Sequence, residues 1–168
     1  PAQVLHDLHI GVRQVLRQDV EGEETLSRDG MDIALVRLFP RDYRLVYAGA
    51  NLPLYYTQGI ELKEIKPDKK AIGGEQLEEE RFFTEHELQL EAGDTFFLFT
   101  DGVVDQDGGP EGKRFGTRRL KEFILETVHE PSMPRRRALF NMRWKEWKDY
   151  EQEREQVDDV TMWGVRLW

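Results

Sequence analysis

Residues 97–105 read Phe-Leu-Phe-Thr-Asp-Gly-Val-Val-Asp, and this stretch decides the fold. The apolar run over Thr95–Thr100 predicts a central, buried β-strand. Asp101 and Gly102 follow the strand at once, so a carboxylate stands at the end of a sheet. Such a carboxylate costs little when it faces a cation and much when it faces nothing. The glycine beside it lets the backbone turn sharply or approach a ligand closely.

A second acidic motif stands near the C-terminal end of the chain. Asp158 and Asp159, in Gln-Val-Asp-Asp, precede Val160–Leu167, which is predicted to be the closing strand. If the two strands are neighbours, Asp101, Asp158 and Asp159 converge at one end of the sheet. Clustered carboxylates need a counter-charge, and a hard divalent cation with oxygen ligands supplies it. Taken singly, Asp-Gly is typical of a turn and Asp-Asp of a solvated loop or cap, so only the combination is specific.

The segments around these motifs change hydrophobic period from helix to strands and back to helices. Sequential strands joined by short turns favour antiparallel hairpins over βαβ units. We therefore expect an α+β fold with an antiparallel sheet rather than a doubly wound fold. The predicted elements are a helix over residues 1–18, a loop over Asp19–Gly30, and strands over Ile33–Phe39, Arg44–Ala50, Leu54–Thr57, Ile60–Ile65 and Phe82–Leu90.

Two helices are expected in the C-terminal part of the chain. The first is predicted from a cap at Thr117 to about Val128, and the second begins near Pro131 or Pro134, since proline is tolerated in a first turn. The second helix is predicted to turn Leu139, Met142 and Trp147 inward.

Several single residues are interpreted as structural. The run Arg135–Arg137 is interpreted as a solvated helix start, with an acidic partner or a substrate phosphate as the alternative. His6 and His9 share a helix face and are interpreted as surface residues rather than metal ligands. The four tryptophans are expected to pack in the core or at its edge.

The composition fits one folded domain over residues 1–168, with 39% hydrophobic residues to build a core. The chain has 24 Lys and Arg against 33 Asp and Glu, and the net charge of −9 disfavours a nucleic-acid-binding surface. Cysteine is absent, which excludes disulfides, thiolate catalysis and Cys-ligated zinc. No apolar run approaches the roughly 18 residues of a membrane span and no signal peptide opens the chain, so a cytoplasmic location is expected.

The two aspartate motifs resemble those of the C-terminal part of the metal-dependent protein phosphatases (PPM, 2C type). More narrowly, they are similar to the SpoIIE branch of bacterial, sensor-linked members. The similarity covers nearly the whole chain in order. The stretches that carry it are Asp29–Leu35, Tyr47–Tyr55, Asp101–Pro110, Lys113–Gly116 and Gln156–Thr161.

The resemblance implies an αββα sandwich of two mainly antiparallel sheets flanked by helices, with a two-metal Mn²⁺ or Mg²⁺ site at one end of the sheets. Asp101 matches the metal-ligating Asp of the Asp-Gly motif, and Gly102 matches its glycine. Asp158 matches the metal-ligating first Asp of the closing motif. Asp159 stands where relatives carry Asn or Asp beside the metal. Asp105 is a candidate contact behind the metal ligands or an additional one.

The implied reaction is hydrolysis of phosphoserine or phosphothreonine on a protein, by the output domain of a bacterial signalling protein. The implied substrates are anti-sigma-factor antagonists of the STAS type, in partner-switching signalling. A metal-activated water is the implied nucleophile, so no side chain is expected to be a catalytic nucleophile. The resemblance leaves open the identity of the substrate, the choice between Mn²⁺ and Mg²⁺, and an upstream sensor with a membrane anchor.

One part of the family's pattern is absent from residues 1–168. The family's first half carries a Gly-Asp…Gly-His-Gly stretch whose aspartate bridges the two metals, and Pro1–Leu5 resembles the helix after that stretch. The domain is therefore expected to be N-terminally truncated, to hold one metal or none, and to be inactive alone. Uncovered sheet edges would favour a homo-oligomer.

Two alternatives to a phosphatase remain open from the sequence. The missing bridging aspartate favours a non-catalytic interaction or dimerisation module with a vestigial metal site. A single-metal hydrolase of another type is disfavoured, because no histidine or nucleophile constellation accompanies the carboxylates.

Overall fold

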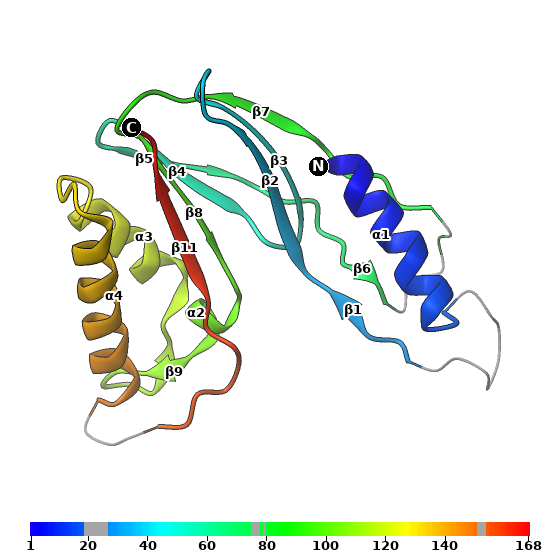
Figure 1. Ribbon diagram of the computed structural model, residues 1–168. Helices are drawn as coiled ribbons and strands as arrows, with labels where there is room; N and C mark the ends of the chain where they lie inside the picture. Colours follow the sequence, from blue (N-terminus) through cyan, green and yellow to red (C-terminus); the bar gives the residue numbers. More distant parts are fainter. Residues whose placement is uncertain (19–26, 75–77, 79, 151–153) are drawn as a thin grey trace. The chain divides into compact units, whose positions relative to one another are not determined.

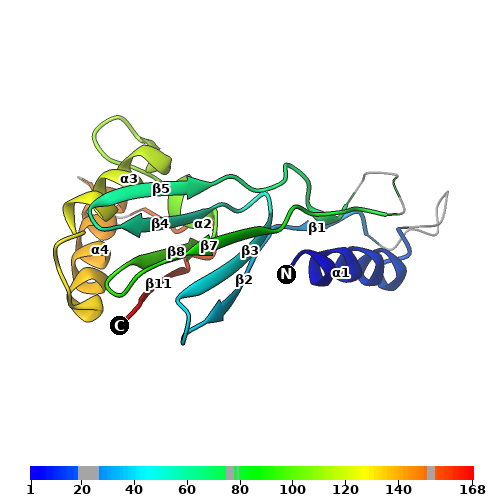
Figure 2. The same cartoon turned by 90° about the horizontal axis from the view of Figure 1, so that it is seen from above.

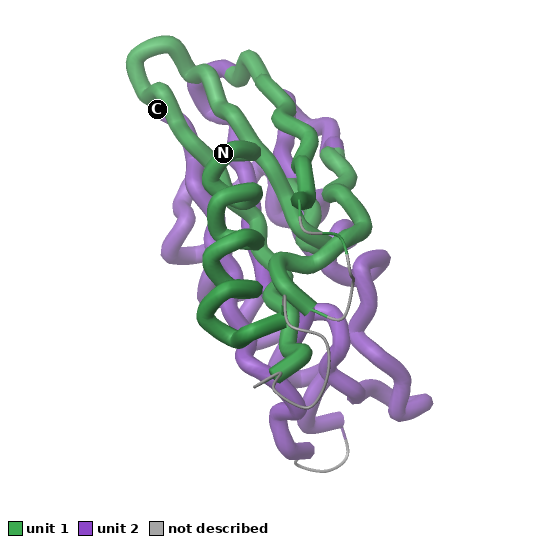
Figure 3. The backbone as a smooth tube through the Cα atoms, turned by 90° about the vertical axis from the view of Figure 1, so that its right-hand side faces the viewer, with its two compact units in different colours: residues 1–54, 64–90 green, residues 55–63, 91–168 purple. Residues whose placement is uncertain are grey.

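The computed structural model describes residues 1–18, 27–74, 78, 80–150 and 154–168 (Figure 1). These residues form two compact units, which Figure 3 shows in different colours. The first unit holds residues 1–54 and 64–90, and the second holds residues 55–63 and 91–168. None of the described helices is long and apolar enough to cross a membrane.

The first unit is built on a three-stranded antiparallel sheet in the order β2–β3–β7. Strands β2 (Ile33–Phe39) and β3 (Arg44–Ala50) pair along their whole length and have the predicted bounds. Strand β7 (His86–Gln89) is shorter than the strand expected over Phe82–Leu90. The predicted antiparallel hairpin is therefore confirmed.

Helix α1 (Ala2–Val15) belongs to the first unit and ends three residues earlier than expected. Its apolar positions Leu5, Leu8 and Val12 pack in one cluster with residues of β3 and of β6 (Ile72–Gly73). The loop expected over Asp19–Gly30 lies largely outside the described residues, and its last residue opens the short strand β1 (Gly30–Met31), which pairs with β6.

His9 on α1 is fully buried, so its assignment as a surface residue was wrong. Its Nδ1 accepts the backbone N–H of Gly73 at 3.0 Å, and its Nε2 lies 3.4 Å from the carbonyl oxygen of Glu78. Gly73 has a φ of +66°, and the His9 ring supplies a buried acceptor for its N–H. Burial, and then the nearby Arg81 guanidinium, hold the pKa of His9 below its ordinary value.

This lowered pKa predicts a pH-dependent stability. Below an ordinary histidine pKa of about 6.5, this histidine is protonated in the unfolded chain but stays neutral in the folded chain. The free energy of unfolding therefore decreases as the pH is lowered. Urea unfolding between pH 7 and pH 5 should show this loss in the wild-type chain and a smaller loss in His9→Asn, whose Oδ1 can still accept the Gly73 N–H. His129→Asn is the control, because His129 is exposed. If His129→Asn reduced the loss of stability between pH 7 and pH 5 as much as His9→Asn does, the assignment to His9 would be contradicted.

The second unit is built on a four-stranded sheet in the order β11–β8–β4–β5. Strand β8 (Thr95–Phe99) lies inside the sheet, antiparallel to both neighbours, as the apolar run predicts. The other strands are β4 (Leu54–Gln58), β5 (Glu61–Ile65) and β11 (Met162–Arg166). The remaining elements are α2 (Gly102–Asp105), β9 (Asp107–Gly108), β10 (Lys113–Arg114), α3 (Gly116–Glu126) and α4 (Met133–Lys148).

Helices α3 and α4 lie together on one side of this sheet (Figures 1 and 2). Phe97 and Phe99 of β8 pack in one buried cluster with Phe123 of α3 and Phe140 of α4. The Phe123 and Phe140 rings meet edge to face, with centroids 5.3 Å apart. Aromatic burial of this kind contributes strongly to a core, so β8 is held rigidly between its neighbours and the helices.

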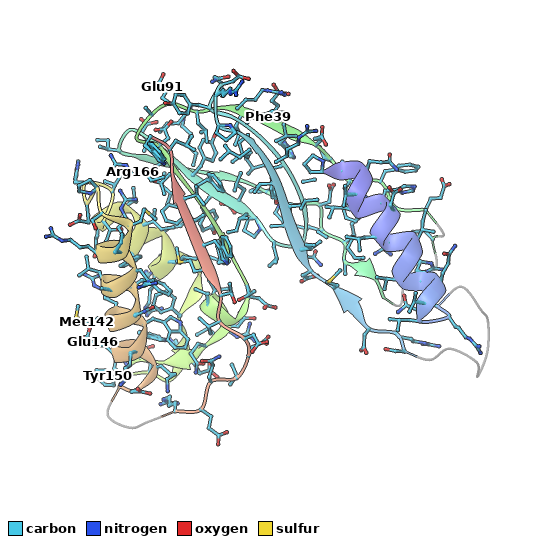
Figure 4. The ribbon with its side chains drawn as sticks, viewed as in Figure 1. Phe39, Glu91, Met142, Glu146, Tyr150 and Arg166 are labelled. Carbon is cyan, nitrogen blue, oxygen red and sulfur yellow. The ribbon has the colours of Figure 1, made fainter. Side chains whose placement is uncertain are left out.

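The inward face of α4 differs from the prediction. Leu139 and Met142 are 39% and 49% exposed, and Met142 lies on the outward side of α4 in Figure 4. Phe140 and Arg136 are buried instead. Burial of Arg136 is tolerated because its guanidinium donates to the carbonyls of Glu130 and Val128 and to the Thr95 hydroxyl. The prediction of a solvated run therefore holds for Arg135 and Arg137 and is wrong for Arg136.

The helix starts and the tryptophans agree with the prediction only in part. Helix α3 begins at Gly116, before the predicted cap Thr117, and Ser132 caps α4 by accepting the N–H of Arg135. Trp144 and Trp147 are part of the packing around the core, as expected. Trp163 and Trp168 are 66% and 98% exposed, so the expectation of packing was wrong for them.

Candidate metal-binding site

Asp101 lies two residues after the end of β8, at one end of the sheet. It forms the N-cap of the single turn α2, and its Oδ1 accepts the N–H of Gly102 at 2.9 Å. Its carbonyl accepts the N–H groups of Val104 and Asp105 at 2.8 Å. The rest of the Asp101 side chain is exposed, so a carboxylate on a rigid backbone faces solvent.

The antiparallel pairing of β11 with β8 brings the second motif to the same end of the sheet. Met162 lies opposite Phe99, and the N–H of Thr100 donates to the carbonyl of Thr161 at 3.0 Å. Asp158 and Asp159 therefore come alongside Asp101 and Gly102, as the neighbouring-strand argument predicts.

The two motifs come close together at Gly102. A Cβ on Gly102 would lie 2.5 Å from the carbonyl oxygen of Asp159 and 3.3 Å from the carbonyl carbon of Asp158. Only a residue without a side chain allows the two backbones to meet in this way. Gly102 is thus a near-site residue that brings the two acidic segments into contact.

The carboxylates themselves are exposed and only partly engaged. Oδ1 of Asp158 accepts the N–H of Asp159 at 2.6 Å, and Asp159 is exposed to solvent. In the described part of the chain, no three His, Asp or Glu side chains form a group that could hold a metal. An all-oxygen set of exposed carboxylates suits a hydrated Mg²⁺ or Mn²⁺ that keeps several waters. The donor chemistry therefore fits one hydrated cation and falls short of a complete two-cation centre.

Asp105 lies one turn after Asp101. Its Oδ1 accepts a hydrogen bond from Nη1 of Arg114 at 3.0 Å, across to β10. Within the described residues, the Asp105 carboxylate is therefore paired with an arginine. Its contact with a metal stays a prediction.

Two functional candidates were missed by the sequence reasoning. Thr100 lies inside the motif but was treated only as the end of the strand. Gln106 follows α2 and is buried, with its side chain bonded to the segment before Asp158. The signal that could have indicated Gln106 is its position as a polar residue next to Asp105, four residues after the Asp-Gly pair.

The close contact at Gly102 yields a direct prediction. Gly102→Ala forces the new Cβ against the Asp159 carbonyl, which should lower the free energy of unfolding by about 1–3 kcal/mol, as overpacking does. Thermal or urea unfolding measures this. Gly11→Ala is the control, because no atom lies within 4 Å of its Cβ position on α1, and it should leave stability unchanged or raise it by about 0.5–1 kcal/mol. Equal stability of wild type and Gly102→Ala would contradict the close approach.

The sequence and the fold of the chain were compared with those of known proteins. The profile of the family described as Stage II sporulation protein E (SpoIIE) matches residues 1–168. No curated protein matches the chain by sequence. In contrast, 28 chains of solved structures match its fold.

The SiaA-PP2C domain of Pseudomonas aeruginosa is 32% identical, with a TM-score of 0.77 over 99% of this chain. The phosphatase domain of the cell fate determinant SpoIIE from Bacillus subtilis is 12% identical, with a TM-score of 0.61 over 98% of this chain and 72% of that chain. A bacterial serine phosphatase is 11% identical, with a TM-score of 0.67 over 99% of this chain and 68% of that chain. The chain spans 60% of the SiaA domain chain. The expected α+β fold of the PP2C type is confirmed.

Proposed function

The chain belongs to the SpoIIE family, and from this membership we propose that it is part of a metal-dependent protein serine/threonine phosphatase domain. The observation that carries the proposal is the β8–β11 pairing, which brings Asp101–Gly102 against Asp158–Asp159 at one end of a rigid sheet. The proposed substrate is phosphoserine or phosphothreonine on an anti-sigma-factor antagonist of the STAS type. The domain would be the output of a cytoplasmic bacterial signalling protein.

The proposed roles follow from the positions of the side chains. Asp101 and Asp158 would hold Mn²⁺ or Mg²⁺, and Asp159 stands next to them. Bound cations supply positive charge for the phosphoryl oxygens and make a water acidic enough to react near neutral pH. The chain's own contribution is to fix the carboxylates on β8, α2 and the segment before β11. Because these carboxylates are exposed, a phosphorylated segment of another protein can approach them.

Residues 1–168 on their own are proposed to be inactive. Catalysis by two metals needs both cations held together, and the described carboxylates suit only one. The chain has no Gly-His-Gly stretch and so lacks the aspartate that bridges two cations in the family's pattern. Measurable Mn²⁺-dependent hydrolysis of p-nitrophenyl phosphate by residues 1–168 would contradict this part of the proposal.

A second candidate role has an observation of its own. β11 is the end strand of its sheet among the described residues, and Trp163 on this strand is 66% exposed. An open strand edge with an exposed aromatic side chain is suited to pairing with another chain. A homo-oligomer or a non-catalytic interaction module is therefore the alternative proposal, and light scattering at working concentration tests the homo-oligomer.

Titration calorimetry with MnCl₂ tests the metal part of the proposal. We expect residues 1–168 to bind Mn²⁺ weakly, and Asp101→Asn and Asp158→Asn each to abolish the heat of binding, because each removes a charged oxygen ligand. Asp42→Asn is the matched control, since Asp42 is an exposed carboxylate in the first unit. Binding that survives both site substitutions, or no binding by the wild type, would contradict the assignment of the cation to these residues.

A further inference from the structure

The segment from Glu155 to Asp159 carries two of the proposed metal ligands, yet apolar packing does not hold it. All five of its residues are exposed, and Val157 is 63% exposed. Burial of apolar surface therefore contributes little to its conformation. Hydrogen bonds from neighbouring elements must keep Asp158 and Asp159 in place.

Gln106 holds the segment on the side before Asp158. Its side chain is buried, and its Nε2 donates to the carbonyl oxygens of Glu155 and Asp107, both at 3.1 Å. Its Oε1 accepts the N–H of Val157 at 3.4 Å. One amide thus bonds to the main chain one and three residues before Asp158, using both donors and an acceptor.

Thr100 holds the segment on the side after Asp158. Its hydroxyl donates to the carbonyl of Asp159 at 2.7 Å and accepts the N–H of Thr161 at 2.9 Å. The main-chain N–H of Thr100 adds a bond to the carbonyl of Thr161. The side chain just before Asp101 is therefore bonded to the main chain on both sides of Val160.

Both holding residues are themselves fixed to the core of the second unit. Thr100 directly follows the core strand β8, and Gln106 directly follows α2. The indole N–H of Trp144 on α4 donates to the carbonyl of Val103, and the N–H of Phe115 donates to the carbonyl of Gln106. The backbone at both holding residues is therefore attached to the core of the second unit.

We propose that Thr100 and Gln106 form a two-point clamp that sets the position of the Asp158 and Asp159 carboxylates relative to Asp101. Both are positioning residues, because they act on the main chain of the acidic segment and not on the cation. The inference rests on the proposed function for its consequence, the affinity for Mn²⁺. The clamp itself is a property of the metal-free chain and can be measured without metal.

The test uses residues 1–168 with four substitutions. Gln106→Met removes the amide at similar volume, and Thr100→Val removes the hydroxyl at similar shape. Thr100→Ser keeps the hydroxyl. Thr57→Val is the matched control. The buried Thr57 hydroxyl also bonds to main chain, accepting the N–H of Thr95 and donating to its carbonyl, but Thr95 lies at the other end of β8.

Amide hydrogen exchange by NMR, without metal, is the first readout. The N–H of Val157 should exchange about tenfold faster in Gln106→Met, and that of Thr161 about tenfold faster in Thr100→Val, since each loses its acceptor. Thr100→Ser and Thr57→Val should keep the wild-type rates at both positions. Unchanged rates in Gln106→Met and Thr100→Val would overturn the clamp, whatever the wild type does with metal.

The dissociation constant for Mn²⁺ is the second readout. It should rise about tenfold in Gln106→Met and in Thr100→Val, as is usual when groups that orient metal ligands are lost. It should stay at the wild-type value in Thr100→Ser, and also in Thr57→Val even if that variant melts at a lower temperature. A constant within twofold of wild type in both clamp variants would overturn the positioning role. A wild type that binds no Mn²⁺ would overturn the proposed function, and the exchange rates would then decide the clamp alone.

Discussion

The antiparallel pairing of β8 with β11 is the constraint on which the candidate site depends. Each strand carries an acidic motif beyond one end, and antiparallel pairing makes these ends coincide. The pairing alone would leave the two segments a strand spacing apart. The segments come closer at Gly102, because this residue has no side chain and the Asp159 carbonyl can approach the backbone of α2.

The energetics of the site separate into a rigid part and a lightly held part. Asp101 follows a strand buried among phenylalanines of β8, α3 and α4, so its position follows from the core. Asp158 and Asp159 stand on an exposed segment whose place depends on hydrogen bonds from Thr100 and Gln106. Each such bond contributes about 0.5–1.5 kcal/mol net, so the segment is easier to displace than the strand end it faces. This asymmetry suits a site that has to accept a ligand between the two segments.

The sequence predicted most of the framework, because hydrophobic period and turn residues are local signals. The bounds of β2 and β3 and the central position of β8 followed from apolar runs. The meeting of the acidic motifs was predicted on the condition that the two strands are neighbours, which the β8–β11 pairing fulfils. The prediction failed where tertiary contacts override local pattern. His9 and Arg136 are buried because backbone groups outside their own helices satisfy their polar atoms, the Gly73 N–H for His9 and the Val128 carbonyl for Arg136. Gln106 was missed for the same reason, since its partners lie near residue 155.

The position at which one Mn²⁺ ion binds can be measured directly on the chain. Paramagnetic Mn²⁺ broadens the NMR signals of nearby amides, so titration into isotope-labelled residues 1–168 locates the ion. We predict that the amides of residues 100–102 and 157–160 broaden together, at the same added Mn²⁺, while those around the exposed Asp42 keep their intensity. Broadening confined to one of the two segments, or spread evenly over the exposed carboxylates, would contradict the claim that the β8–β11 pairing builds a shared cation site.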